Sequence, residues 1–224
     1  MIPALASPSL ADWAIANPGA SRVFQRHHLD YCCGGKTSLA DACRAKGLDP
    51  VAVVAEIAAE VPTAEDRDWN SAPLPALIDH IEARYHTWLH QNLESLRDLA
   101  RKVGRVHGAE HPEIVELAAI VERLVAETVD HLGKEEKILF PWARLGNRGS
   151  AAQAPIDCLH GEHEAHGANL ARLRDITGGY VTPPEACTSW KALYLRLAEL
   201  EAELMAHIHL ENNLLFPRLL RDAR

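Results

Sequence analysis

The stretch "HLGKEEKILFP" (131–141) places a histidine four residues before a glutamate inside an otherwise apolar, helix-forming run. The stretch "HIHLENNLLFP" (207–217) repeats the same frame 76 residues later, with an aliphatic pair, Phe and Pro after the glutamate in each case. In a helix, side chains at i and i+4 lie on the same face, one turn apart. Each stretch therefore presents an imidazole and a carboxylate together on one helix face, and the repeat indicates two halves of one symmetric site.

The composition and the breaks in the chain predict an all-α fold. Hydrophobic residues make up 47% of the 224 residues and aromatic residues only 5%, with abundant Ala and Leu, which favours helices over sheets. Segments rich in Gly or Pro separate four long helical stretches, which we expect at about 75–103, 112–145, 154–176 and 184–220. Four antiparallel helices with short connections form an up-down four-helix bundle.

The chain before the bundle has a different pattern. Residues 1–60 contain short apolar pieces interrupted by turn signals, and they predict a small helical domain of three or four helices, the last at 50–60. Residues 61–75 carry three prolines and a charge cluster and are predicted to be a linker. The bundle then occupies 76–224.

Charge, hydropathy and cysteine content exclude several classes of function. The formal net charge is −8 and no Lys/Arg cluster is present, so we expect no nucleic-acid partner. No apolar stretch approaches the roughly 18–20 residues of a membrane span, and the N-terminus has no basic residue before Arg22, unlike a secretory signal. The five cysteines are an odd number, which argues against a disulfide framework and predicts a reducing cytoplasm.

Polar side chains interrupt the core-facing stripe of every long helix. Counting in steps of four and three, the stripe of the second helix runs through Leu117, Val121, Leu124, Thr128, His131, Glu135, Ile138 and Trp142. The same count brings at least one histidine onto the core face of each other helix. The polar residues that occupy core positions at equivalent places in the two halves are His86, His131, Glu135, His163, His207 and Glu211.

These six side chains predict a metal site. A buried glutamate is unfavourable unless it is paired or bound to a metal. Imidazole with carboxylate is a donor set that suits iron and, as borderline alternatives, zinc or manganese. The two-fold pattern suits two equivalent ions bridged by the two glutamates. A hydrogen-bonded core without metal is the alternative. His90 and His166 are left open as extra ligands or as groups beside the ligands, whereas Glu136 and Glu162 are expected on the solvated flank.

The segment "DYCCGGK" (30–36) is the second informative motif. Gly34-Gly35 allows a sharp turn, and Thr37 or Ser38 can cap the following helix. A helix N-terminus and Lys36 near Cys32 and Cys33 are expected to lower the thiol pKa. Thiol exchange, transient metal binding and partner contact are the functional hypotheses, and a buried turn of small residues is the structural one.

Together these motifs resemble the iron-sulfur cluster repair proteins, a family also called repair of iron centres. The resemblance covers nearly the whole chain and rests on "DYCCGGK" (30–36), "ARYH" (83–86), "HLGKEEKILFP" (131–141), "GEHEAHG" (161–167), "TPPEACTSWKALY" (182–194) and "HIHLENNLLFP" (207–217). It implies a hemerythrin-like bundle with two non-haem iron ions, oxo- or hydroxo-bridged, on the six residues above, and a functional cysteine pair at Cys32 and Cys33. His90 departs from the family pattern.

The resemblance implies a cytoplasmic protein that supports the repair of iron-sulfur clusters damaged by nitric oxide or oxidants, by donating iron to the damaged proteins. Two alternatives use the same centre: an enzyme that reduces nitric oxide or peroxide, and a sensor or carrier of dioxygen or nitric oxide. Whether the protein is an enzyme, which client it repairs and whether it forms a homodimer stay open at this point.

Overall fold

The structure is a computed structural model that describes residues 8–61, 63 and 66–221. The predicted small domain, linker and bundle therefore include residues outside this description: 1–7, then 62, 64 and 65, then 222–224. The described residues form helices and no strand beyond one isolated bridge between Ser9 and Ser38, so the predicted all-α class is confirmed. No helix among them has both the length and the apolar character to cross a membrane.

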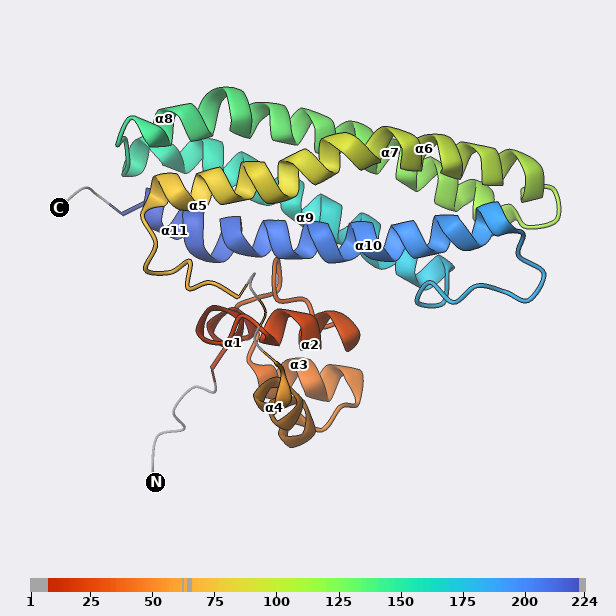
Figure 1. Cartoon of the computed structure of the whole chain (residues 1–224), viewed down its shortest axis with the longest axis horizontal. Coiled ribbons are helices and arrows are strands. Elements are labelled where there is room, and N and C mark those ends of the chain that lie inside the picture. The colour runs from red at the N-terminus through yellow and green to blue at the C-terminus, as the bar shows by residue number, and fades with distance from the viewer. Residues whose placement is uncertain (1–7, 62, 64–65, 222–224) are drawn as a thin grey trace.

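Four long rods form the bundle and run side by side (Figure 1). Rod one consists of α5 (Leu74–His80), η1 (Ile81–His86) and α6 (Thr87–His107). Rod two consists of α7 (Pro112–Lys134), η2 (Glu135–Leu139) and α8 (Phe140–Arg144). Rod three consists of the short 3-10 turn η3 (Ser150–Ala152) and α9 (Gln153–Ile176). Rod four consists of α10 (Thr188–Leu210), η4 (Glu211–Leu215) and α11 (Phe216–Leu219).

Rod one extends beyond its predicted end at residue 103. The helix continues through Gly104 to His107, because this glycine serves close packing and does not end the helix. A Cβ atom at Gly104 would lie 3.1 Å from the Cβ of Ala118 on α7, so a larger side chain would push the two helices apart. At the other end of the chain, rod four begins at Thr188 and not at 184, with Cys187 as its N-cap residue.

Most of the predicted core stripe is buried, with one correction in rod two. Ile138, expected in the core, is 64% exposed, whereas the next residue, Leu139, is 3% exposed. The reason is η2, a π-helical turn in which the N–H of Phe140 donates to the carbonyl oxygen of Glu135, five residues back. Such a turn holds one residue more than an α-turn, so it shifts the buried face by one position.

Similar π-helical turns occur in two other rods. The N–H of Thr87 donates to the carbonyl of Glu82 in η1, and the N–H of Phe216 donates to the carbonyl of Glu211 in η4. Proline follows directly after Phe140 and after Phe216 and lies in the last short helical turn of its rod. Each π-helical turn therefore begins or ends at a histidine or glutamate of the predicted metal site.

The small domain consists of α1 (Leu10–Ala16), α2 (Ala20–Arg26), α3 (Leu39–Lys46) and α4 (Pro50–Ala59). Ser9, Ser38 and Asp49 cap the N-termini of α1, α3 and α4 through side-chain oxygens, which accept backbone N–H bonds. The domain lies against the bundle beside α10 (Figure 1), and its buried side chains belong to the same hydrophobic cluster as those of α6, α7 and α10.

The segment between the small domain and the bundle makes hydrogen bonds near both of its ends. Arg22 on α2 donates hydrogen bonds to Glu60 and Asp66, at 2.8 and 2.7 Å. Arg218 on α11 donates to the carbonyl oxygens of Trp69 and Ala72, at 3.1 and 2.6 Å. The segment predicted to be a linker therefore has ionic and hydrogen-bonded contacts with both the small domain and the bundle.

Candidate metal centre

The six predicted polar core residues meet in the middle of the bundle. None of the six residues is more than 1% exposed. Their ligand atoms form two compact groups in which all atoms lie within 4.8 Å of one another. The first group is His86, Glu135, His207 and Glu211, and the second is His131, Glu135, His163 and Glu211. The two glutamates belong to both groups, so the residues form two adjoining sites with shared carboxylates.

The histidines form two pairs that cross the halves of the sequence. The Nε2 atoms of His86 and His207 lie 3.0 Å apart, which joins rods one and four. The Nε2 atoms of His131 and His163 also lie 3.0 Å apart, which joins rods two and three. The sequence repeat pairs rods one and two with rods three and four, but each histidine pair takes one member from each half.

Each glutamate reaches one histidine of each pair. Glu211 lies 3.0 Å from Nε2 of His207 and 3.3 Å from Nε2 of His163. Glu135 lies 3.4 Å from Nε2 of His131 and 3.5 Å from Nε2 of His86. The two carboxylates therefore lie between the histidine pairs, the position from which a carboxylate can bridge two metal ions.

The buried carboxylates also test whether a cation fits this site. Among the described residues, both oxygens of Glu135 and Oε2 of Glu211 are buried and have no hydrogen-bond partner. A buried carboxylate oxygen without a hydrogen bond is unfavourable, whereas a cation between the oxygens would satisfy them. Four imidazoles and two carboxylates, with no thiolate, are a donor set typical of non-haem iron, so the residues fit that metal.

Three of the four histidines are held from behind by a hydrogen bond at Nδ1. Glu136 contacts Nδ1 of His86 at 2.9 Å, and Glu162 contacts Nδ1 of His131 at 2.8 Å. Asn212 contacts Nδ1 of His163 at 2.7 Å. These bonds orient each ring so that Nε2 faces the centre, as is usual for metal-binding histidines. Sequence periodicity placed Glu136 and Glu162 on the solvated flank and missed their contacts with His86 and His131. The one sequence feature that could have indicated these contacts is that Glu136 is adjacent to Glu135 and Glu162 is adjacent to His163.

The fourth histidine has a different environment. Nδ1 of His207 is buried and has no hydrogen-bond partner among the described residues. The ring of Tyr85 stacks against it, with centroids 5.9 Å apart and planes at 18°. Phe140 and Phe216 stack in the same way on His86 and His163, at 5.5 and 5.8 Å. Aromatic rings therefore pack against three of the four histidines of the centre.

Burial and neighbouring charges favour a neutral ring at His86 and a charged ring at His131. Burial, together with the nearby His207, lowers the pKa of His86 to about 4, so its Nε2 lone pair is available to a metal at neutral pH. Burial also disfavours the charged form of His131, but the Glu135 carboxylate outweighs this and raises its pKa to about 9. Burial and the neighbouring Glu211 raise the pKa of Glu135. A divalent cation would displace these protons.

The two histidines left open by the sequence occupy different places. His90 is about half exposed, and its Nε2 contacts Glu136 at 2.8 Å, so it supports the group behind His86 and lies outside both compact groups. His166 is 1% exposed and lies beside His131, with ring centroids 5.3 Å apart, but it also lies outside both groups.

The cysteine pair lies against the bundle close to this centre. Cys33 Sγ is 3.4 Å from the carbonyl oxygen of His163, and Asn212 donates to the carbonyl of Cys32 at 3.2 Å. The expected lowering of the thiol pKa is wrong for Cys32. Its hydrogen bond with Cys33 and its burial raise the pKa of this thiol well above the ordinary value, and α3 begins only at Leu39. Asp30, Cys32 and Cys33 also form a compact group of metal-binding atoms.

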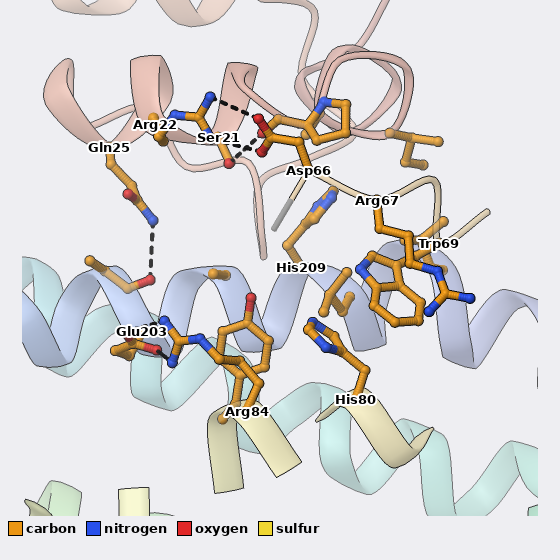
Figure 2. A pocket seen from close by; sticks show the side chains of 18 of the residues that line it. Ser21, Arg22, Gln25, Asp66, Arg67, Trp69, His80, Arg84, Glu203 and His209 are labelled. Carbon is orange, nitrogen blue, oxygen red and sulfur yellow. Dashed lines mark hydrogen bonds and ion pairs between the residues drawn. The ribbon is translucent and has the colours of Figure 1, made fainter. Parts of the chain in front are cut away.

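A cavity of about 210 Å³ lies between the small domain, the linker segment and the bundle (Figure 2). Trp69 and His80 stack on its wall with centroids 4.1 Å apart, and Arg84 forms an ion pair with Glu203 there at 2.8 Å. Tyr85, the ring that stacks on His207, also lines it. The cavity is thus separated from a predicted ligand by a single aromatic ring.

The geometry agrees with comparisons to known proteins. Residues 77–219 match the hemerythrin HHE cation binding domain, and residues 6–61 match a domain of unknown function, DUF542. The proteins named iron-sulfur cluster repair protein YtfE from Citrobacter koseri, Shigella boydii and Escherichia coli O81 are each 43% identical over 212 residues, covering 94% of this chain and 96% of theirs. The chain therefore belongs to the hemerythrin-like family of iron-sulfur cluster repair proteins that its sequence motifs predicted.

Proposed function

We propose that this protein is a cytoplasmic di-iron protein that supports the repair of iron-sulfur clusters damaged by nitric oxide or oxidative stress, by donating iron to the damaged proteins. The six ligands are His86, His131, Glu135, His163, His207 and Glu211, and the finer assignment is two iron ions joined by an oxo or hydroxo bridge. Relatives named for cluster repair, 43% identical over almost the full chain, support this function.

The observation that carries the proposal is the pair of adjoining four-residue groups that share Glu135 and Glu211. Bound iron would supply a redox-active, exchangeable metal with open positions for nitric oxide or dioxygen, because six protein ligands cannot fill two octahedral shells. The residues themselves orient imidazole rings toward the centre through contacts at Nδ1, and the stacked rings of Phe140 and Phe216 exclude water.

We further propose that residues 1–60 act as a separate domain that presents Cys32 and Cys33 as the iron-transfer group. Asn212 supports this hypothesis because its side chain contacts both the ring of His163, at 2.7 Å, and the carbonyl oxygen of Cys32, at 3.2 Å. The side chain of Asn212 therefore links the predicted metal ligand His163 directly to the cysteine loop. The compact group of Asp30, Cys32 and Cys33 offers the oxygen and sulfur atoms for a transient metal contact.

Anaerobic iron transfer tests the proposed function. The reduced protein, loaded with ⁵⁷Fe, is mixed with a dehydratase whose cluster has been damaged, and recovered activity is followed together with the ⁵⁷Fe content of each protein. We expect recovery in proportion to iron lost from the loaded protein, and none from the metal-free protein. Recovery that does not depend on the iron content would refute donation, and catalytic turnover of nitric oxide would favour the enzyme alternative.

The cysteine hypothesis needs a separate variant. We expect Cys32→Ser/Cys33→Ser to bind two irons per chain as the wild type does, since no thiolate belongs to the two His/Glu groups, but to transfer iron more slowly. Cys187→Ser is the matched control, because Cys187 is exposed and lies at the N-terminus of α10, twenty residues before His207. Equal transfer rates in the wild type and the double variant would remove the cysteines from the proposal and leave the di-iron centre standing.

A further inference from the structure

His166 breaks the two-fold symmetry of the centre. His86 in rod one and His163 in rod three hold equivalent places in the two groups of ligands. Three residues further along each rod, the first half has Leu89 and the second half has His166. Both side chains are buried, at 0% and 1% exposure, so the two halves differ here by an imidazole in place of an apolar side chain.

One nitrogen of the buried His166 ring lacks a hydrogen-bond partner among the described residues. This nitrogen is Nε2, which is itself buried. The ring lies edge-on to that of His131, with centroids 5.3 Å apart and planes at 79°, and 6.5 Å from the ring of His163. A buried polar atom without a partner is unfavourable, and such atoms call for a functional explanation. The histidine pair that His166 adjoins, His131 and His163, offers such an explanation.

Distance excludes direct metal binding by His166 in this arrangement. Imidazole nitrogens bind first-row metals at about 2.1 Å, so two ligands of one ion lie no more than about 4.2 Å apart. All ligand atoms of the compact group around His131 and His163 lie within 4.8 Å of one another, and His166 is not a member of this group. The ring is therefore beside the metal position but not within it, the place from which an N–H can reach a small molecule bound to the metal.

We propose that Nε2 of His166 donates a hydrogen bond to a small anionic or diatomic ligand at the metal position formed by His131 and His163. The position formed by His86 and His207 has Leu89 at the equivalent place and lacks this donor, so exogenous ligands favour one of the two positions. This inference rests on the proposed function, because it requires metal at the two groups, and it adds which position a ligand takes and which side chain selects it.

Azide is the probe that tests this inference. Azide is titrated into the oxidised, iron-loaded protein, and the dissociation constant is measured from the ligand-to-metal absorption band. Loss of one charge-assisted hydrogen bond should weaken azide binding on the order of tenfold in His166→Leu. His166→Gln, which keeps an N–H donor, should recover most of the affinity. In the wild type, the azide stretching frequency should shift in D₂O, and this shift should vanish in His166→Leu.

His160→Leu is the matched control, because His160 lies three residues before His163 on α9 as His166 lies three residues after it. It should keep the azide affinity. All variants should bind two irons, and metal-free His166→Leu should unfold at or above the wild-type temperature, since leucine replaces an unpartnered polar ring. If the wild type and His166→Leu both bind two irons and have the same azide affinity, and the wild type shows no D₂O shift, only the His166 inference is overturned. If the wild type binds no iron, the proposed function is overturned as well.

Discussion

At the scale of single residues, the four histidines differ in the contact made by Nδ1, the ring nitrogen that faces away from the centre. His86 and His131 contact carboxylates there, Glu136 and Glu162, and His163 contacts the amide of Asn212. Asn212 follows Glu211 as Glu136 follows Glu135, so the repeat has a carboxylate in one half and a neutral amide in the other. A carboxylate increases the basicity of the ring more than an amide, which makes the two metal positions unequal in their outer contacts.

Glu162→Gln tests this outer contact. Removing the charge behind His131 should weaken iron binding about 10- to 100-fold, because the ring loses both basicity and orientation. Iron affinity measured by competition with a chelator checks this. Glu164→Gln is the control, since Glu164 is exposed on the same helix and should leave the affinity unchanged. Equal losses in both variants would assign the effect to surface charge and not to the contact with His131.

Glu135→Leu/Glu211→Leu tests the shared carboxylates. The double variant should lose stoichiometric iron, because each glutamate belongs to both groups of ligands. Its metal-free form should be more stable to heat than the metal-free wild type, since two buried carboxylates, three of whose oxygens make no hydrogen bond among the described residues, are replaced by apolar side chains. Iron content by elemental analysis and thermal unfolding check the two parts. Retention of two irons per chain would refute the site assignment.

At the scale of secondary structure elements, the π-helical turns set which side chains reach the core. η2 begins at Glu135 and η4 begins at Glu211, so the turn that positions each shared carboxylate also changes the helix register after it. Single π-helical turns inside α-helices are frequent at functional sites for this reason. The helix before the turn follows the predicted stripe, whereas the last residue of η2, Leu139, and the first residue of α8, Phe140, face the core.

Two neighbouring alanine substitutions test the register after η2. Leu139→Ala should lower the free energy of unfolding by about 2–5 kcal/mol, because this side chain is 3% exposed. Ile138→Ala should change it by no more than about 0.5 kcal/mol, because Ile138 is 64% exposed. Urea unfolding of both variants is the measurement. An uninterrupted α-helix, as the sequence stripe predicts, would give the larger loss at Ile138.

At the scale of the whole molecule, the cysteine loop docks on rod four. Asn213 donates to the carbonyl of Tyr31 at 3.0 Å and contacts His209 at 2.9 Å, and the rings of Tyr31 and His209 lie 5.3 Å apart. His209 is 6% exposed, so an ionisable ring is buried where the small domain meets the bundle. Protonation of this ring is therefore coupled to the contact between the two parts.

The pH dependence of unfolding tests the buried His209. Burial lowers its pKa to about 4 from the ordinary 6.5, so between these values the unfolded chain binds a proton that the folded chain does not. Stability of the metal-free protein should therefore fall as pH decreases from 6.5 to 4, by about 3 kcal/mol from this residue. His209→Gln should flatten that slope in urea unfolding, whereas His90→Gln, at a half-exposed site, should not. Identical slopes for wild type and His209→Gln would contradict the assignment.

The sequence by itself determined the features that depend on local periodicity. The steps of four and three found the helices and the buried faces of α6, α9 and α10, and they placed six polar residues on the core side, because spacing along a helix decides which side chains share a face. The motif content also found the family. The repeat of "HLGKEEKILFP" predicted symmetry, and that symmetry is present in the two adjoining groups of ligands.

Only the tertiary structure decided the contacts between rods. The pairing of His86 with His207, the carboxylates behind His86 and His131, and the burial of Cys32 all depend on how helices distant in sequence pack against each other. The π-helical turn at Glu135 likewise removed Ile138 from the core, because one extra residue in a turn rotates everything after it. Periodicity describes one helix at a time, and packing selects the neighbour that each of its faces contacts.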